Sequence, residues 1–232
     1  MSLTNSRVGR WMAGALLSAL VLGALAAVAG AQGTGPQVTV GRLKYGGGGD
    51  WYANPTSLPN LLEALRERTT LDVAERTMTV APTDDDLLLC PVVHMTGHGR
   101  VSFSSEEAAA LREYLERGGF LWADDNYGMD RSFRDAVARV LPEASFVELP
   151  FEHEIFHSFY EFPDGLPKIH EHDGGPPHAY GVFHEGRMVI FYSFNTDIGD
   201  GMEDREVHND PPDVREAAIR MGVNVIVYAL SN

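Results

Sequence analysis

The chain of 232 residues contains a single cysteine, Cys90, so no disulfide bond can form within it. Cys90 precedes a short apolar run and lies away from the polar segments, which favours a buried structural thiol over a nucleophile. Basic residues are also few, since 18 Lys and Arg accompany 33 Asp and Glu, for a formal net charge of −15. We therefore expect neither nucleic acid nor an anionic membrane surface as a partner, whereas cations, metal ions included, can bind.

Several diagnostic motifs are missing as well. No Gly-x-Ser-x-Gly sequence marks the nucleophile of a serine hydrolase. The chain has a run of glycines, but neither the Gly-Lys-Ser/Thr of a phosphate-binding loop nor the spaced glycines of the dinucleotide fingerprint accompany it. The twelve-residue EF-hand pattern is absent too, and no internal repeat is visible. These absences argue against four common classes of nucleotide-binding, hydrolytic and calcium-binding protein.

The first 31 residues have the pattern of a leader. Arg7 and Arg10 form a basic start, an apolar run covers residues 11–28, and Ala29-Gly30-Ala31 is a small-x-small cleavage site. A cleaved signal peptide is favoured over a retained N-terminal anchor, because an 18-residue run is near the lower limit for spanning a membrane. We expect a secreted or periplasmic protein with a linker at 32–37 and one domain at 38–232. Cleavage removes two arginines and no acidic residue, so the net charge falls from −15 to −17.

The centre of the chain has the pattern of a βαβ unit. Residues 92–95 and 120–123 are short apolar runs typical of buried strands, and residues 104–117 between them have helical spacing. Ser104 and Glu107 fit a capping box at the start of this helix, and Gly118-Gly119 ends it. The two strands should be parallel. Polar turns at 96–99 and 124–128 then follow the carboxyl ends of the strands, where ligands gather in open α/β sheets.

Other segments predict further helices and strands around this unit. We expect strands at 38–44, within 71–80 and at 144–149, and helices at 57–68, 132–141 and 211–230. Glu185-Gly186 separates two strand-like runs, 179–184 and 187–194, as a two-residue hairpin turn would. Residues 151–177 and 195–210 are predicted to be long loops, and such loops are often functional.

The stretches GRLKYGGGGDWYANPTSLPNLL, VVHMTGHGRVSFS, GGFLWADDNYGMDRSFR, LPKIHEHDG and NTDIGDGMEDREVHND together resemble the DUF4159 family. The resemblance runs from about Val38 to Leu230, and this family consists of secreted or membrane-anchored bacterial proteins of unassigned function. It implies a class I glutamine amidotransferase-like, ThuA-like fold: a flavodoxin-like three-layer α/β sandwich with a mostly parallel sheet, to which the sequence adds the hairpin in its C-terminal half. Amidotransferases of this fold carry a cysteine on a sharp strand-to-helix turn. The corresponding turn here, Ala123 to Asn126, has none, so glutamine hydrolysis is not expected.

One group of residues has the chemistry of a metal centre. Imidazoles and carboxylates suit zinc, manganese or iron, and on an extended segment the rings of His170 and His172 point the same way. The predicted metal ligands are His98, His170, His172 and Asp173. Asp124 and Asp125 are candidate catalytic acids or bases, although adjacent side chains diverge. The alternative is that these polar groups brace loops by hydrogen bonding.

A second group is predicted to bind a ligand at the same edge of the sheet. The glycine run at 46–49 lets the backbone approach a ligand closely, or else is a flexible turn. Trp51 and Tyr127 are candidates for stacking on a sugar or flat group. The predicted ligand-binding residues are Gly47, Gly48, Asp50, Trp51, Tyr52, Thr96, Gly97, His98, Asn126, Tyr127 and Glu171.

Two further groups have plainer interpretations. The acidic segment Asp197 to Asp210 offers oxygens for calcium, but a solvated loop is favoured. His94 lies within a strand and is expected to be a core histidine with its hydrogen bonds satisfied.

Glycoside hydrolysis by two carboxylates, with Asp124, Asp125 and Glu171 as candidates, stays open because the sequence does not give their separation.

The sequence thus supports three hypotheses of different classes. The leading one is a secreted domain that binds a polar small molecule or saccharide at the carboxyl edge of its sheet. The second is a metal-dependent hydrolase that uses the histidines and aspartates of that edge, with His98, His170 and His172 as ligands and Asp124 as base. The third is a non-catalytic scaffold that contacts a protein partner in the cell envelope.

Overall fold

Seven strands form one sheet in the order β2-β1-β3-β4-β7-β6-β5, in a computed structural model that describes residues 37–172 and 174–232. The strands are β1 (Val40–Leu43), β2 (Met78–Val80), β3 (Val92–His98), β4 (Phe120–Tyr127), β5 (Phe146–Glu148), β6 (His178–His184) and β7 (Arg187–Phe194). The predicted leader, most of the linker and Asp173 lie outside the described residues. None of the described helices combines the length and apolar character that a membrane span needs.

The sheet is mostly parallel, as predicted. β2, β1, β3, β4 and β7 pair in parallel, whereas β6 pairs antiparallel with both β7 and β5. The β6–β7 hairpin turns at Glu185 and Gly186, which both have positive φ, as a two-residue turn requires. The carboxyl ends of β1, β3, β4 and β7 therefore meet at one edge of the sheet.

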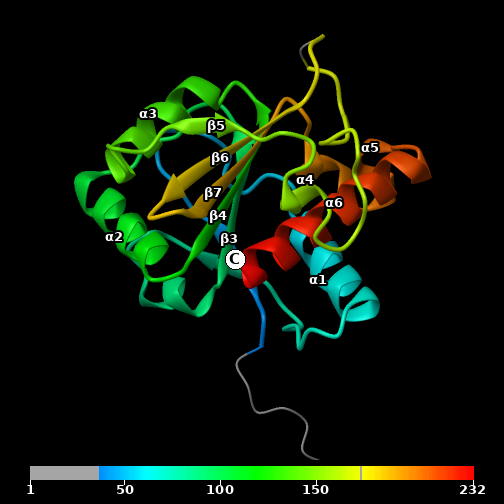
Figure 1. Cartoon of the computed structure of the whole chain (residues 1–232), viewed down its shortest axis with the longest axis horizontal. Coiled ribbons are helices and arrows are strands. Elements are labelled where there is room, and N and C mark those ends of the chain that lie inside the picture. The colour runs from blue at the N-terminus through cyan, green and yellow to red at the C-terminus, as the bar shows by residue number, and fades with distance from the viewer. Residues whose placement is uncertain (1–36, 173) are drawn as a thin grey trace, which may run out of the picture. The chain divides into compact units, whose positions relative to one another are not determined.

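Helices cover both faces of the sheet and complete a three-layer sandwich (Figure 1). The helices are α1 (Ser57–Arg68), α2 (Ser105–Glu116), α3 (Asp130–Val140), α4 (Ile198–Gly201), α5 (Arg205–His208) and α6 (Pro212–Ser231). α1 and α6 pack on one face, where Leu61 meets a core that includes Trp122. α2 and α3 pack on the other face, where Leu111 and Phe133 share a core with Leu121. The predicted fold class is confirmed.

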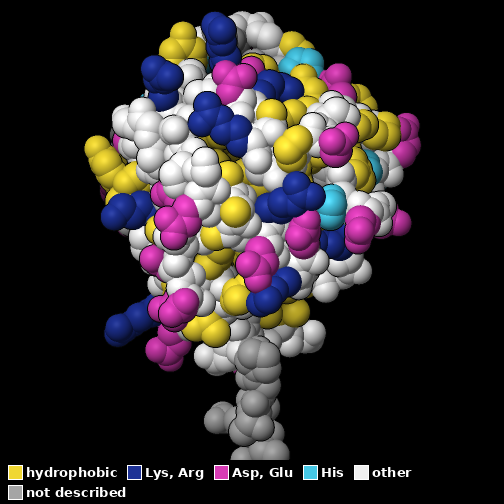
Figure 2. Space-filling view, turned by 90° about the vertical axis from the view of Figure 1, so that its left-hand side faces the viewer, with side chains coloured by type: hydrophobic (Ala, Val, Ile, Leu, Met, Phe, Trp, Pro, Cys, Tyr) yellow, Lys and Arg dark blue, Asp and Glu magenta, His cyan; other side chains and the backbone are white. Residues whose placement is uncertain are grey.

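The outer, solvent-facing surface of α2 and α3 carries charged side chains of both signs. Figure 2 shows Asp and Glu side chains beside Lys and Arg on this side of the molecule. Ion pairs four residues apart contribute to the pattern, Arg112 with Glu116 and Arg134 with Asp130 among them. The start of α2 carries the predicted capping box, since Ser104 and Glu107 exchange side-chain and backbone hydrogen bonds. Such pairs and caps define the helix at the surface while its apolar side faces the sheet.

The central strands are longer than predicted. Thr96, Gly97 and His98 belong to β3, and Asp124 to Tyr127 belong to β4, so neither segment is a turn. Polar side chains continue these strands because the backbone ladder persists: Thr96 pairs with Asp124, and Asp124 also pairs with Ser193 of β7. The predicted strand-to-helix turn at Ala123 to Asn126 is therefore wrong, and α3 begins only at Asp130. Conversely, β2 is limited to Met78–Val80, the end of the predicted 71–80 segment.

One core residue departs from expectation. His94 of β3 is fully buried, as predicted, but neither ring nitrogen has a hydrogen-bond partner among the described residues. Its ring instead meets the ring of Trp122 edge to face, with centroids 4.5 Å apart. Burial lowers the pKa of His94 from 6.5 to about 3, and the nearby Arg42 charge adds to this. His94 is therefore neutral in the folded protein near pH 7.

We predict that His94→Phe removes part of the acid sensitivity of the fold. The folded pKa lies below the unfolded one, so the unfolded chain binds a proton first and stability is lost as pH falls below about 6.5. Between pH 7 and 4.5 the wild type should lose roughly 2–3 kcal/mol more than the variant. Urea unfolding at both pH values measures this. Replacement of the surface residue His184 by Gln serves as control, and equal acid losses in wild type and His94→Phe would contradict the prediction.

Candidate functional site

The end of β4 places two aspartates on opposite faces of the sheet. Asp124 is fully buried on the α1–α6 side, where its carboxylate accepts hydrogen bonds from Ser193 Oγ (2.5 Å) and the Gly199 backbone N–H (2.6 Å). Burial raises the pKa of Asp124 to about 7, although both hydrogen bonds lower it. Ser193 in turn accepts a hydrogen bond from the Trp122 indole. With its carboxylate fully engaged, Asp124 is placed to position its neighbours and does not reach a substrate.

Asp125 lies on the other side and borders open space. Its carboxylate accepts hydrogen bonds from the Met129 backbone N–H and the Tyr192 hydroxyl, each at 3.2 Å. Burial raises the pKa of Asp125 to about 6. A cleft of about 290 Å³ opens between the end of β4 and the segment after β7, lined by Asp125, Tyr127 and His172 among others. Asp125 is thus the predicted catalytic carboxylate that faces this cleft.

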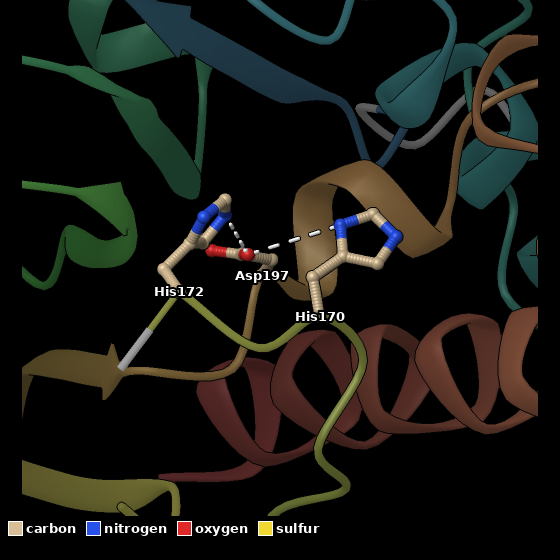
Figure 3. Close-up of side chains that lie close together, drawn as sticks. All are labelled: His170, His172 and Asp197. Atoms are coloured by element: carbon tan, nitrogen blue, oxygen red, sulfur yellow. Dashed lines mark ion pairs between the residues drawn. The ribbon is translucent and has the colours of Figure 1, made fainter. Parts of the chain in front are cut away.

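The segment after β7 carries a buried carboxylate in an unusual backbone conformation. Asn195 and Asp197 both have left-handed backbone, with φ of 59° and 63°, which Asn and Asp tolerate better than other side chains. Asp197 is 1% exposed, and neither carboxylate oxygen has a hydrogen-bond partner among the described residues. Two histidine rings approach it instead: His172 Nε2 lies 2.5 Å and His170 Nδ1 lies 3.8 Å from Asp197 Oδ2. Figure 3 shows the rings on opposite sides of this carboxylate.

These three side chains have the spacing of metal ligands. One ligand atom from each of His170, His172 and Asp197 lies within 4.8 Å of the other two. Neighbouring ligand atoms of a tetrahedral zinc site stand roughly 3.3 Å apart, given bond lengths of about 2.0–2.1 Å. The two measured distances to Asp197, 2.5 and 3.8 Å, fall on either side of that value.

A second group shares His170. His170 Nδ1 lies 3.3 Å from Asp200 Oδ2, and one atom each of His170, Asp200 and His208 also fits within 4.8 Å. The other ring nitrogen, Nε2, lies 2.9 Å from Asp210 Oδ1. The hydrogen bond to Asp200 raises the pKa of His170 to about 9. Because both groups use the same side of His170, they are alternative positions for one ion.

Buried negative charge dominates the electrostatics of this edge. Burial, followed by the charges of Asp124 and Asp200, raises the pKa of Asp197 to about 9. For Asp200, burial alone would raise the pKa, but the hydrogen bond with His170 and the charge of His208 lower it overall. Burial lowers the pKa of His172. Such displaced pKa values, in a cluster of acids and histidines, are characteristic of functional sites.

The predicted His-Glu-His triplet lies beside this segment. The backbone N–H groups of Ile169 and His170 both donate to the Thr196 carbonyl, which fixes the triplet next to Asp197. His170 and His172 face Asp197 while Glu171 is exposed, in accord with the predicted alternation. The fourth predicted ligand, Asp173, lies outside the described residues. Thr196, which anchors the triplet, was not singled out from the sequence.

The predicted ligand-binding residues separate into three environments. Tyr127, which is 53% exposed, and Asn126 border the cleft. Thr96 donates to Asn126 at 2.5 Å and braces the floor of the site. Trp51 lies elsewhere, with Lys44 Nζ 5.6 Å from its ring centroid, and Trp51 and Tyr127 do not line one cleft. The exposed Tyr52 packs edge to face on Trp51.

The glycine run packs against the chain's own backbone. Gly46 exchanges hydrogen bonds with Ser102, and the Gly49 N–H donates to the Arg100 carbonyl. A Cβ on Gly47 would stand 2.7 Å from the Arg100 carbonyl oxygen, at a φ of 104° that side chains rarely adopt, whereas the space around Gly48 is open. Glycine at position 47 therefore permits close packing of two loops.

A His-Glu-x-x-His pattern occupies residues 153–157. The zinc motif needs an α-helix that puts both histidines on one face, but here only Glu154–Phe156 form a 3₁₀ turn. Both nitrogens of His157 are engaged, Nδ1 with Glu161 at 2.6 Å and Nε2 with the Phe151 carbonyl at 2.9 Å. His153 Nδ1 accepts from the Ile155 N–H. This pattern lies outside the metal-ligand groups described above.

Three members of the cluster were missed by sequence reasoning. Asp197, Asp200 and His208 belong to the acidic segment expected to be a solvated loop. That expectation is wrong, because Asp197, Asp200 and Glu203 are 1%, 7% and 4% exposed and the segment contains α4 and α5. The usable signal was position: this segment directly follows β7, whose carboxyl end lies at the same edge as β3 and β4.

We predict that Gly199→Ala destabilises the site. An added Cβ would stand 2.6 Å from Asn54 Nδ2 and 3.2 Å from Asp124 Oδ2, so the contact between α4 and β4 must open. The expected loss is about 1–3 kcal/mol, despite the better helix propensity of alanine. Urea unfolding measures it, with Gly175→Ala as control, since its nearest atom would be 3.6 Å away. Equal stability of both variants would contradict the prediction.

Comparison with known proteins identifies a family for this chain. A family model described as a domain of unknown function, DUF4159, matches residues 39–230, from the start of the sheet to the end of α6. A search of the curated proteins finds no match. The resemblance based on sequence motifs is confirmed by the family match. The chain belongs to the DUF4159 family.

Proposed function

We propose that this protein is a metal-dependent hydrolase that acts outside the cytoplasm and holds one transition-metal ion with His170, His172 and Asp197. The observation that carries the proposal is the Asp197 carboxylate. It is 1% exposed and lacks a hydrogen-bond donor among the described residues, yet two imidazole nitrogens point at one of its oxygens. The location outside the cytoplasm rests on the leader sequence.

A bound cation supplies what this carboxylate lacks. Burying a carboxylate without a partner costs several kcal/mol, so buried charges are normally paired or coordinate metals. Burial, followed by the charges of Asp124 and Asp200, raises the pKa of Asp197 to about 9, so without a cation this carboxyl group holds a proton at pH 7. A divalent cation between Asp197 and the two histidines would displace that proton and stabilise the carboxylate.

The ligand types favour a borderline transition metal. Two imidazoles and one carboxylate suit zinc, manganese or iron better than calcium, which prefers six to eight oxygens. Three protein ligands also leave a coordination position open, as catalytic metal sites do. A metal at such a position supplies a nucleophilic water at neutral pH by lowering the pKa of that water.

The cleft beside His172 offers room for a substrate and a base for the reaction. Asp125 lines this cleft and has its pKa raised to about 6, close to the range in which a carboxylate serves as general base at neutral pH. The Met129 N–H and the Tyr192 hydroxyl hold its orientation. Tyr127 presents an exposed ring at the rim, suited to a polar ring-containing substrate such as a saccharide.

A second candidate is binding of a polar small molecule or saccharide without chemistry. The exposed Tyr127 ring and the polar lining of the cleft favour it, because both serve recognition equally well. Turnover separates the two candidates. Metal-loaded protein should release product from model esters, and a chelator should abolish that release, whereas a pure binding protein retains its ligand unchanged.

We predict that purified protein binds about one zinc ion per chain and that His172→Ala and Asp197→Asn bind it at least about 100-fold more weakly. Loss of a ligand should cost more than the roughly 10–100-fold that follows loss of a ligand's hydrogen-bond partner. Calorimetric titration and elemental analysis measure both quantities. His178→Ala, a histidine paired with Glu148 on β5, is the matched control. Wild-type protein that stays metal-free would remove the proposal.

We also predict that zinc affinity rises between pH 6 and 9. The pKa values of Asp197 and His170 are both about 9, so both groups carry protons at pH 7 that a metal must displace. Titrations at pH 7 in buffers of different ionisation enthalpy should therefore report release of about two protons. An affinity that does not change with pH would show that these two groups are not ligands.

A further inference from the structure

His98 and Asp50 form a pair at the rim of the site that the metal-ligand groups leave out. His98 Nδ1 lies 3.2 Å from Asp50 Oδ2, and the other oxygen of Asp50 accepts a hydrogen bond from the His98 backbone N–H. The imidazole is thus held at its backbone and at one ring nitrogen. With Nδ1 donating to Asp50, Nε2 is the nitrogen left for proton transfer.

The glycine run explains how Asp50 reaches His98. The Asp50 N–H donates to the His98 carbonyl, and the Gly49 N–H donates to the Arg100 carbonyl, so residues 46–50 run against residues 98–102. A Cβ on Gly49 would stand 2.9 Å from the carbonyl oxygens of both His98 and Arg100. The run of small residues is therefore what allows Asp50 to come within hydrogen-bonding distance of the ring.

β3 is also shaped to present His98. The pairing of β3 with β4 shifts register between Gly97 and His98, as a β-bulge does, and bulges commonly redirect a side chain beside an active site. Gly97 has a φ of 137°, and a Cβ there would stand 2.5 Å from the Tyr45 hydroxyl and 2.8 Å from Asp50 Oδ1. Only glycine fits at this bulge, because any side chain at position 97 would occupy the space that the Asp50 carboxylate fills.

The pair faces the proposed metal centre. The rings of His98 and His172 lie 6.4 Å apart between centroids, and His98 pairs across the strands with Tyr127, which lines the cleft. His98, expected from the sequence to be a ligand, therefore stands beside the proposed metal ligands, with its ring edge-on to the ring of His172.

Stability does not account for this arrangement. The side chains of His98 and Asp50 are 49% and 33% exposed, and ion pairs so open to solvent contribute little to folding. Two backbone constraints, the Gly97 bulge and the close packing of Gly49, nonetheless serve to form it. β-Bulges such as the one at Gly97 are over-represented next to active sites.

We propose that His98 is the general acid of the hydrolytic reaction, with Asp50 as its positioning residue; this inference rests on the proposed function. In ester hydrolysis, a water oxygen bonds to the carbonyl carbon as the carbonyl π bond opens onto its oxygen, while Asp125 accepts a proton from that water. The π bond then re-forms as the bond from carbon to the alcohol oxygen breaks, the electron pair stays on the alcohol oxygen, and His98 Nε2–H donates a proton to it. Asp125 returns its proton to solvent and His98 regains one, so one water is consumed and an acid and an alcohol leave.

The test compares two esters that differ in their need for a general acid. 4-Nitrophenolate leaves without a proton, whereas phenolate benefits from protonation. In zinc-loaded protein, His98→Gln should hydrolyse phenyl acetate about 100-fold more slowly than wild type but 4-nitrophenyl acetate less than about 3-fold more slowly. Asp50→Asn should show the same selectivity with a loss of about 10-fold on phenyl acetate. His178→Gln is the control, and zinc content should be equal in all four proteins.

Each outcome is decisive. Equal losses on both esters, or none on either, would overturn the role of His98 while leaving the hydrolase proposal intact, provided that the wild type turns both over. Zinc-loaded wild type that hydrolyses neither ester would contradict the hydrolase proposal itself, and the inference would fall with it. Reduced zinc content in His98→Gln would return His98 to the role of metal ligand.

Discussion

The buried carboxylate of Asp124 holds the two halves of the site together. It joins Ser193 on the neighbouring strand, 69 positions away in sequence, and the backbone of Gly199 at the start of α4, 75 positions away. Asp197 directly precedes α4, so its place and its left-handed backbone follow from this anchor. A fully buried acid with two short hydrogen bonds is thus a structural clamp that fixes α4 beside the His170, His172 and Asp197 group.

The clamp brings together more negative charge than the fold alone needs. Burial works against ionisation of Asp124, Asp197 and Asp200, the charge of Asp200 further raises the pKa of Asp124, and the charges of both further raise the pKa of Asp197. His170 compensates in part through its contacts with Asp200 and Asp210. Stability would be served better by apolar residues at these positions. Charges retained at such a cost are best explained by a reaction or a ligand that uses them.

The sequence predicted the architecture well because apolar periodicity is a direct consequence of burial. The runs at 92–95 and 120–123, the capping box at Ser104 and the turn at Glu185-Gly186 all appear in the structure. The ends of the central strands were missed because Thr96 and Asp124 are polar, and a polar residue after a short apolar run normally indicates a turn. Their partners, Asn126 and Ser193, satisfy them inside the sheet, which pattern alone does not reveal.

The structure brings the predicted residues His170 and His172 together around Asp197, which the sequence analysis did not single out. His170 and His172 were found because their alternation indicates a shared direction, and Asp125 because it follows a buried strand. Asp197 lies among many acids, and the sequence holds no mark of which one is buried. Likewise the glycine run was interpreted as a ligand-contacting loop or a flexible turn, whereas its close contacts are with residues 98–102 of the same chain. Both outcomes depend on tertiary packing between segments distant along the chain.

The order of strands has a consequence for how the protein is made. β4 pairs with β7, and the hairpin partner β6 also lies in the last quarter of the chain. During synthesis, the apolar central strand therefore leaves the ribosome well before its partner, with one edge unpaired and prone to aggregation. A chain of this topology benefits from chaperones that delay folding until translation ends.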